Sequence, residues 1–237
     1  MQLFFIRHAQ SFNNALVEQA GTDDDRDADP ELTETGRRQA VLLADFLKTG
    51  EPDRRRFENN DRPGFGITHL YCSLMVRSVA TGTSIADALA LPLVAWEDLH
   101  EEGGIYLTNR QTGQPEGLPG KPRSFFEEHY PGLRLPDRLN EKGWWNRPFE
   151  DRRSRWERAR RVVRELIERH GDSDDRVAVI SHGGFYNLFL KTLLDLPRDG
   201  VWFTLFNAGI TRLDFHRNVI ELVYQNRVDF LPKDFTT

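Results

Sequence analysis

Residues 3–11 are Leu3-Phe4-Phe5-Ile6-Arg7-His8-Ala9-Gln10-Ser11, an apolar run that ends at two consecutive basic side chains. Aromatic and β-branched residues favour a buried, pleated conformation, so this run predicts a strand over residues 3–6. Three further segments of the same character predict strands over residues 67–72, 93–96 and 177–181. Polar or charged residues follow directly after each of the four apolar runs.

Helical patterns lie between and after these strands. Apolar residues recur at three- and four-residue spacing over residues 37–48, 76–89, 151–170 and 183–194. Strands that alternate with helices indicate βαβ units and a largely parallel sheet. We therefore expect an α/β fold, a three-layer αβα sandwich with a mostly parallel central sheet. Near the C-terminus, residues 202–206, 210–215 and 219–224 predict a meander that ends the sheet.

The segment from residue 103 to residue 149 interrupts this alternation after the third predicted strand. It is rich in Gly and Pro, has a short helical pattern at residues 124–130, and contains Trp144-Trp145. Segments of this length are usually lids or substrate-selecting insertions rather than plain connections. We expect a single domain over residues 1–237, with this insertion as its lid.

Composition restricts the class of protein. The formal net charge is −5, so a broad basic surface for nucleic acid is not expected. No apolar stretch is long enough to cross a bilayer, and the first residues suit a strand better than a signal peptide. We expect a cytoplasmic protein that does not bind a membrane. Cys72 is the single cysteine, which excludes an intramolecular disulfide and a cysteine-based zinc site.

Two charged stretches are explained most simply as solvated surface. Residues 23–30 form an acidic loop, but the loop lacks the glycine and the terminal glutamate of a calcium-binding EF-hand. Arginines and glutamates are interleaved over residues 151–170, which indicates an ion-paired, solvated helix face rather than a ligand site.

The residues that follow the four predicted strands include several with useful chemistry. In open α/β sheets, ligands bind in the crevice beyond the carboxyl ends of the strands, so these side chains should face one crevice. Taken singly, each of these side chains could have only a structural role. The glycine turn before the predicted helix at residues 183–194 could bind an anion at its N–H groups, although glycine turns before helices are also common in themselves. In chain order the set is Arg7 and His8, Ser73 and Arg77, Glu101 and Glu102, and Ser181-His182-Gly183-Gly184.

These motifs resemble the histidine phosphatase superfamily, in its phosphoglycerate mutase-like branch. Ala9-Gln10 departs from the commoner Gly-Glu, and Leu74 stands where a proline is usual, but neither change removes a charged group that the family's mechanism needs. Five stretches carry the resemblance in the family's order: Arg7-His8-Ala9-Gln10-Ser11 with Asn14, Leu32-Thr33-x-x-Gly36-x-x-Gln39-Ala40, Ser73-x-x-x-Arg77-Ser78-x-x-Thr81, Leu99-His100-Glu101, and Val179-Ile180-Ser181-His182-Gly183-Gly184.

The resemblance implies a histidine phosphatase or a phosphoglycerate mutase that acts on a small phosphorylated metabolite. His8 would carry the phosphoryl group as a phosphohistidine, and the neighbouring arginines should keep its imidazole neutral by like-charge repulsion. Glu101, or alternatively Glu102, would protonate the leaving group. Because guanidinium groups can supply the positive charge, no metal ion or other cofactor is expected. The implied site consists of catalytic His8, Glu101 and His182, and phosphate-binding Arg7, Asn14, Arg77 and Gly183.

Three other classes of protein fit the sequence less well. A cysteine phosphatase needs five residues between Cys and Arg, whereas four separate Cys72 from Arg77. A metallohydrolase lacks its His-Glu-x-x-His motif here. A non-catalytic phosphate-binding protein of the same fold would not need the complete set of histidines, arginines and glutamate. The remaining histidines are scattered along the chain and suit structural roles: His69, His100, His129, His170 and His216.

The choice between a phosphatase and a mutase depends on the insertion. A mutase must hold its intermediate while the substrate reorients, which requires additional basic residues around a closed pocket. Arg110, Lys121 and Arg123 could supply them, although the sequence does not show where these side chains point. We favour the phosphatase. The sequence does not identify the physiological substrate, and it leaves a monomer and a homo-oligomer equally open.

Overall fold

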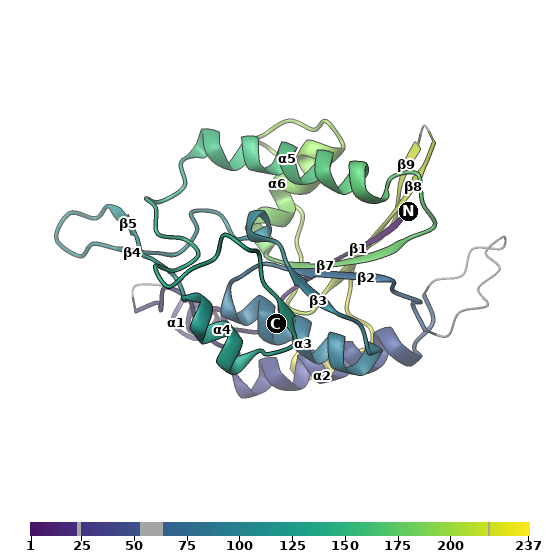
Figure 1. The fold of residues 1–237 in the computed structure, drawn as a ribbon, viewed down its shortest axis with the longest axis horizontal. Coiled ribbons are helices and arrows are strands. Elements are labelled where there is room, and N and C mark those ends of the chain that lie inside the picture. Colours follow the sequence, from purple (N-terminus) through teal and green to yellow (C-terminus); the bar gives the residue numbers. More distant parts are fainter. Residues whose placement is uncertain (23–24, 53–63, 218) are drawn as a thin grey trace.

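The computed structural model describes residues 1–22, 25–52, 64–217 and 219–237. A seven-stranded sheet crosses the molecule in the order β6-β3-β2-β7-β1-β8-β9 (Figure 1). Strands β6, β3, β2, β7 and β1 run parallel to one another, whereas β8 is antiparallel to both of its neighbours, β1 and β9. The strands are β1 (Gln2–Arg7), β2 (His69–Cys72), β3 (Leu93–Ala95), β6 (Leu133–Arg134), β7 (Arg176–Ser181), β8 (Ile210–His216) and β9 (Val219–Arg227).

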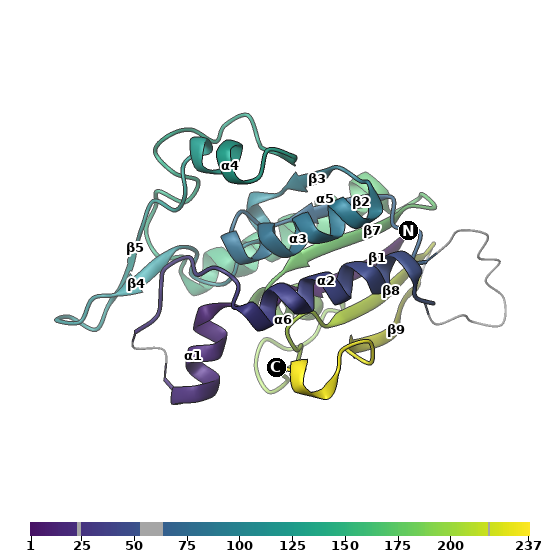
Figure 2. The same ribbon diagram turned by 90° about the horizontal axis from the view of Figure 1, so that it is seen from below.

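Helices cover both faces of this sheet (Figures 1 and 2). Helices α2 (Glu34–Thr49) and α3 (Val76–Leu89) lie on one face, and α5 (Arg152–His170) and α6 (Gly183–Leu193) lie on the other. The expected three-layer αβα fold with a mostly parallel sheet is therefore confirmed. Within the described ranges, no helix combines the length and the apolar character needed to span a bilayer.

Strand β1 joins the two cores because its side chains alternate between the faces of the sheet. Phe4 and Ile6 pack in the core beneath α2 and α3, whereas Leu3 and Phe5 pack in the core beneath α5 and α6. Arg7, the last residue of β1, lies opposite Ser181 of β7 in parallel register. The residues after both strands, which include His8 and His182, consequently leave the sheet at the same edge.

The predicted strand at residues 202–206 is wrong. This segment is irregular, and Trp202 is 67% exposed. Side chains satisfy its backbone in place of a strand ladder, because Asn187 bonds both the N–H and the carbonyl of Phe203, at 2.7 and 3.0 Å. The guanidinium of Arg7 donates to the Leu205 carbonyl at 2.7 Å. The segment therefore contacts Arg7, at the edge of the sheet where His8 and His182 lie, and does not form a strand of the sheet.

The insertion is more than a loop. It contains the hairpin of β4 (Tyr106–Thr108) and β5 (Pro115–Gly117), and helix α4 (Arg123–His129), close to the predicted 124–130. It then adds β6 to the main sheet beside β3. Two short 3-10 helices, η1 (Glu97–Leu99) and η2 (Lys233–Phe235), precede the insertion and end the chain.

Helix α1 (Phe12–Ala20) has a weak apolar pattern and was not predicted. A capping box formed by Ser11 and Asn14 starts it, in which each side chain bonds the other's backbone N–H. This local device fixes the chain directly after His8. The helix extends away from the edge of the sheet that carries the site (Figure 2).

The two charged stretches are only partly solvated. Asp23 and Asp24 lie outside the described residues, and Asp25 forms an exposed ion pair with Arg110 at 2.8 Å. Asp29, in contrast, is buried, which contradicts a wholly solvated acidic loop. On α5, Arg158 is 1% exposed, so the expected solvated arginine face is wrong at that position.

The close contact between α2 and the chain after His8 gives a stability prediction. A Cβ atom at Gly36 would lie 2.0 Å from the carbonyl oxygen of Gln10, and both are backbone positions that cannot easily yield. We expect Gly36→Ala to lower the free energy of unfolding by about 1–3 kcal/mol in urea denaturation. Gly132→Ala, where nothing lies within 4 Å of the added atom, is the matched control. Equal stability of the two variants would contradict this packing.

Candidate active site

His8 follows β1, and its two ring nitrogens have different partners. The Nδ1 atom lies 2.7 Å from the carbonyl oxygen of Ala9, and the Nε2 atom lies 3.1 Å from the Nε of Arg77. A guanidinium group can only donate, so Nε2 must accept and Nδ1 must carry the hydrogen. The geometry therefore assigns a neutral ring with its lone pair on Nε2, which is the form that can attack phosphorus.

Electrostatics favour the same protonation state. The His8 side chain is 3% exposed, and its pKa is held well below the usual 6.5. Burial is the largest cause, and repulsion by Arg77 and Arg7 follows. The expected like-charge effect is present, but desolvation, which the sequence could not reveal, is larger.

Arg77 lies in the first turn of α3, where it contacts His8 and a buried carboxyl group. Its Nη1 is 3.7 Å from the Oδ1 of Asp29, and its Nη2 is 3.1 Å from the sulfur of Met75. The same Asp29 oxygen accepts the N–H of Val76 at 3.0 Å. Burial raises the pKa of Asp29 to about 7, although the charge of Arg77 opposes this shift. Asp29 thus helps to hold the Arg77 guanidinium in place. The sequence did not indicate this role, because Asp29 lies among other acidic residues that were expected to be solvated.

Arg7 supplies a second cation to the site. One terminal nitrogen donates to the Leu205 carbonyl, and its Nε atom is buried with no partner among the described residues. Burial lowers the pKa of Arg7 to about 10, and Glu101 counteracts this while Arg77 adds to it. An arginine remains charged at that value near neutral pH. A buried donor without a partner is suited to an anion.

His182 follows β7, and its ring centroid lies 5.0 Å from that of His8. Its Nε2 is 2.7 Å from the hydroxyl of Ser73, which also receives the N–H of Met75 at 3.4 Å. If the hydroxyl donates to Nε2, the hydrogen of a neutral ring lies on Nδ1, which is buried without a partner among the described residues. Burial holds the pKa of His182 well below 6.5, with Arg77 and His8 contributing. His182 could then present an N–H to a phosphoryl oxygen.

Glu101 is held by backbone N–H groups. One carboxylate oxygen accepts from Gly184 at 3.0 Å, and the other accepts from Phe185 at 2.7 Å and from Glu102 at 2.9 Å. The first turn of α6 therefore holds a carboxylate of the chain itself, where the sequence had indicated a place for an external anion. A Cβ on Gly184 would lie 2.5 Å from that carboxylate, so only glycine leaves room for it.

The two adjacent glutamates have different partners. Glu102 forms an ion pair with Arg155 of α5. The charge of Glu101, in contrast, acts on both Arg7 and Arg77. Glu101 is thus the glutamate on the side of the two site arginines.

Asn14 and Gly183 remain less defined. The side-chain oxygen of Asn14 accepts from Ser11 and from Asn207, at 2.9 and 3.2 Å, and it caps α1. Asn207 also donates to the carbonyl of His8 at 3.0 Å, a contact with no sequence signal. A Cβ on Gly183 would lie 3.6 Å from the Nε of Arg7, which places this glycine against the site arginine. Phosphate binding by Asn14 and Gly183 stays a prediction.

Two scattered histidines meet elsewhere. Among the described residues, one trio could hold a metal ion: His69 at the start of β2, His170 at the end of α5, and Asp175 just before β7. Both ring nitrogens of His170 already have partners, Tyr71 at 3.0 Å and Asp175 at 2.8 Å. The arrangement suits a satisfied structural histidine. Cys72 is also buried, and burial raises the pKa of its thiol, which disfavours a thiolate nucleophile.

The low pKa of His8 predicts a pH-dependent stability. Below pH 6.5 the unfolded chain binds a proton that the folded chain does not, so the stability present above pH 6.5 is lost as the pH falls. Relative to His8→Asn, we expect the unfolding free energy of the wild type to fall by up to about 1.4 kcal/mol per pH unit below pH 6.5. Urea denaturation from pH 8 to about pH 5 measures this difference. A constant difference between the two proteins would mean that His8 titrates alike in both states.

Known proteins resemble this chain in sequence or in fold. A protein of Yersinia pestis named "Probable phosphoglycerate mutase GpmB" is 26% identical over 221 residues, which cover 92% of this chain and 86% of the relative. Phosphoserine phosphatase of Entamoeba histolytica in complex with 3-phosphoglyceric acid matches with a TM-score of 0.59 at 18% identity, over 98% of this chain and 99% of that one. A mycobacterial glucosyl-3-phosphoglycerate phosphatase in complex with VO3 matches with a TM-score of 0.57 at 21% identity, over 96% and 99%.

The two structures establish the likeness of the fold, and the sequence itself establishes the family. The sequence profile of the histidine phosphatase superfamily (branch 1) matches residues 3–228, nearly the whole chain. Its span includes His8, Arg77, Glu101 and His182. The chain therefore belongs to the histidine phosphatase superfamily, branch 1.

Proposed function

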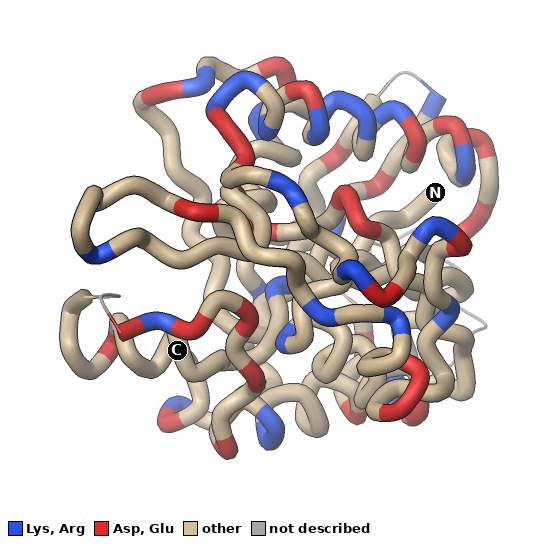
Figure 3. Tube along the Cα trace, turned by 60° about the vertical axis from the view of Figure 1, so that its left-hand side comes forward, with Lys and Arg blue, Asp and Glu red and all other residues tan. Residues whose placement is uncertain are grey.

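We propose that the protein is a phosphomonoester hydrolase that carries the phosphoryl group on Nε2 of His8. The observation that carries this proposal is the neutral His8 ring, whose Nδ1–H is held by Ala9 and whose Nε2 lone pair meets the Nε of Arg77. A buried lone pair between cationic groups is poised for an electrophile that bears negative charge. A small phosphorylated metabolite has that character. Acidic and basic residues are interspersed along the described chain (Figure 3), so attraction of the substrate would depend on the local site charges.

In the first step, Nε2 of His8 bonds to phosphorus while the bond from phosphorus to the ester oxygen breaks. For this step the Glu101 carboxyl group must carry a proton when the substrate is bound, and it gives that proton to the departing oxygen. The Arg77 hydrogen bond passes from Nε2 to a phosphoryl oxygen, and Arg7 and His182 donate to the others. The ring becomes positively charged, and its Nδ1–H remains bonded to the Ala9 carbonyl. These donors offset the charge on the transferring group.

In the second step, water attacks phosphorus and gives a proton to Glu101, which acts now as a base. The bond between phosphorus and Nε2 breaks, and inorganic phosphate leaves. His8 returns to its neutral state, and Glu101 returns to its protonated state. The cycle is therefore balanced with the ester and water as its only reactants. The positive charge that stabilises the transferring phosphoryl group comes from Arg7 and Arg77.

A phosphoglycerate mutase is the second candidate, favoured by the name of the Yersinia relative. The contacts of the insertion support the phosphatase instead. Arg110 pairs with Asp25 at the surface, and Arg123 is bonded to the carbonyls of Leu139 and Pro136. These two basic side chains are thus engaged in other contacts. Lys121, the third, lies 4.8 Å from the ring centroid of Phe125, and its charge acts on Asp29, so it is the one basic side chain of the three that still fits the mutase reading. A phosphometabolite panel assayed with and without 2,3-bisphosphoglycerate, including isomerisation of 3-phosphoglycerate, separates the two activities.

The central prediction concerns two variants. His8→Ala should abolish both turnover and trapping of a labelled phosphoenzyme, because no other group replaces the nucleophile. Glu101→Ala should reduce turnover by about 10²–10⁴-fold yet still permit some labelling, because the nucleophile is intact. Rapid quench with a ³²P-labelled substrate measures both.

Glu102→Ala is the matched control for the proton donor, because it removes the neighbouring carboxylate that pairs with Arg155. It should retain most of the turnover. Full activity of His8→Ala would refute the proposed function. A larger loss for Glu102→Ala than for Glu101→Ala would transfer the donor role to Glu102. Lack of turnover of any generic phosphomonoester by the wild type would favour a non-catalytic, phosphate-binding protein.

A further inference from the structure

We propose that Arg158 of α5, together with Glu150, is a positioning residue that sets the place of the proton donor Glu101. This inference rests on the proposed function, because it gives Arg158 a task only if Glu101 transfers a proton. Neither residue belongs to the motifs that carry the family resemblance. Arg158 was expected in a solvated face, and it is among the most buried large side chains of the described chain.

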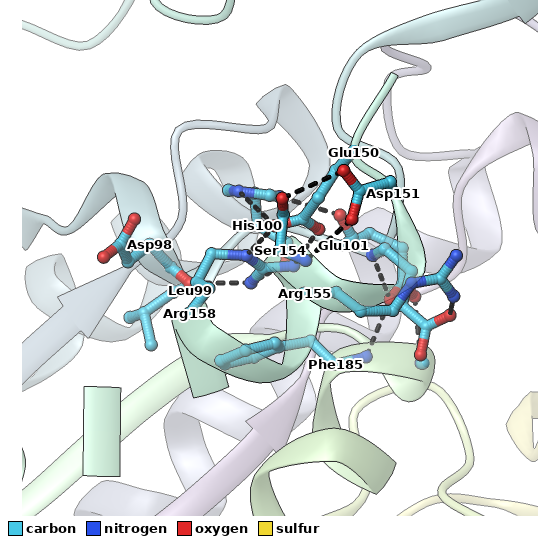
Figure 4. A network of polar contacts seen from close by, with 12 residues as sticks. Asp98, Leu99, His100, Glu101, Glu150, Asp151, Ser154, Arg155, Arg158 and Phe185 are labelled. Carbon is cyan, nitrogen blue, oxygen red and sulfur yellow. Dashed lines mark hydrogen bonds and ion pairs between the residues drawn. The ribbon is translucent and has the colours of Figure 1, made fainter. Parts of the chain in front are cut away.

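The donors of Arg158 bind the backbone that leads into Glu101 (Figure 4). Its Nη1 donates to the carbonyl of Asp98 at 2.8 Å and to the carbonyl of His100 at 2.9 Å. These carbonyls belong to the residues three before and one before Glu101. The guanidinium thus fixes the path of the turn from which the Glu101 side chain projects.

Glu150 fixes the guanidinium in turn. Its two carboxylate oxygens accept from Nε and Nη2 of Arg158, each at 2.7 Å, in a planar bidentate pair. The backbone N–H of Glu150 donates to the carbonyl of Gly103 at 3.1 Å. The pair therefore holds the chain on both sides of Glu101, before it at Asp98 and His100 and after it at Gly103.

The guanidinium also contacts the element that binds the Glu101 carboxylate. Its central carbon lies 4.4 Å from the ring centroid of Phe185. The N–H of Phe185 is the donor that reaches Glu101 at 2.7 Å. Arg158 consequently contacts both the segment that carries Glu101 and the first turn of α6 that receives it, so it sets the separation between them.

A purely structural role is the alternative. Burying an ion pair costs several kcal/mol in desolvation, and packed apolar residues often stabilise a fold as well or better. Stability alone would thus not require this pair, whereas an exact backbone path for a general acid would. A misplacement of about 1 Å at a reacting group can lower the rate 10²-fold. The two roles differ in which substrates are affected.

Substrates with different leaving groups distinguish the positioning role of Arg158 from a purely structural role. Phenyl phosphate needs a proton on its departing oxygen, whereas 2,4-dinitrophenyl phosphate releases a stable anion without one. We expect Arg158→Lys to lower kcat/KM for phenyl phosphate roughly 10- to 100-fold and for the dinitrophenyl ester less than about 3-fold. A lysine cannot bind Glu150 in a bidentate manner and reach two carbonyls as well. The ratio of the two kcat/KM values does not depend on the amount of folded enzyme.

Three further variants complete the experiment. Glu150→Gln, a milder change, should shift the ratio in the same direction. Glu101→Gln should show the full leaving-group effect, and adding Arg158→Lys to it should cause no further change in the ratio, because both act on one step. Arg164→Lys, on an exposed turn of the same helix where Arg164 pairs with Glu168, should leave the ratio unchanged.

The outcomes separate the two claims. If Glu101→Gln shows no leaving-group effect, the proposed role of Glu101 fails, and this inference fails with it. If Glu101→Gln shows the effect but Arg158→Lys and Glu150→Gln lower both substrates equally, the proposed function stands and the pair is only structural. A selective loss in both Arg158→Lys and Glu150→Gln supports the positioning role.

Discussion

The hydrogen bond from Nδ1 of His8 to the Ala9 carbonyl decides which ring nitrogen can react. Arg77 donates to the other nitrogen, so the ring is neutral and its lone pair lies on Nε2. Burial and two guanidinium groups disfavour the imidazolium. The fold supports this state from several sides: the register of β1 and β7 brings His8 beside His182, and Asp29 holds Arg77 in place. In the proposed mechanism, the nucleophile is thus prepared before any substrate binds.

The first turn of α6 binds the carboxylate of Glu101, the proposed proton donor. Its N–H groups at Gly184 and Phe185 hold the Glu101 carboxylate, so this helix end orients the acid group. In the proposed mechanism, the positive charge for phosphate then comes from Arg7, the last residue of β1, and from Arg77 in the first turn of α3. The proposed nucleophile, His8, and the proposed proton donor, Glu101, are thus held by different elements, the end of β1 and the start of α6. Glu101 in turn depends on the chain segment that Arg158 contacts.

Much of the fold was predictable, because strong patterns determine it. The four parallel strands and their helices follow from apolar runs and three- to four-residue spacing, and the strand ends located His8, Arg77, Glu101 and His182. Contacts between distant segments were not predictable. Leu205 contacts Arg7 from the segment 202–206 that was predicted as a strand, and Asn207, directly after that segment, bonds the carbonyl of His8. Asp29 belongs to an acidic run that was expected to be solvated, yet it is buried beside Arg77. Arg158 could not be distinguished from the other arginines of α5, since sequence does not show which one is buried.

The most direct test of the account is the tautomer of His8 in solution. Two-bond ¹H–¹⁵N spectra of histidine-labelled protein at neutral pH report the protonation of each ring nitrogen, and His8→Asn identifies the His8 signals by their loss. We expect a neutral ring with hydrogen on Nδ1 and an unprotonated Nε2. A doubly protonated His8, or one with hydrogen on Nε2, would contradict it, because neither form offers the lone pair that the proposed chemistry requires.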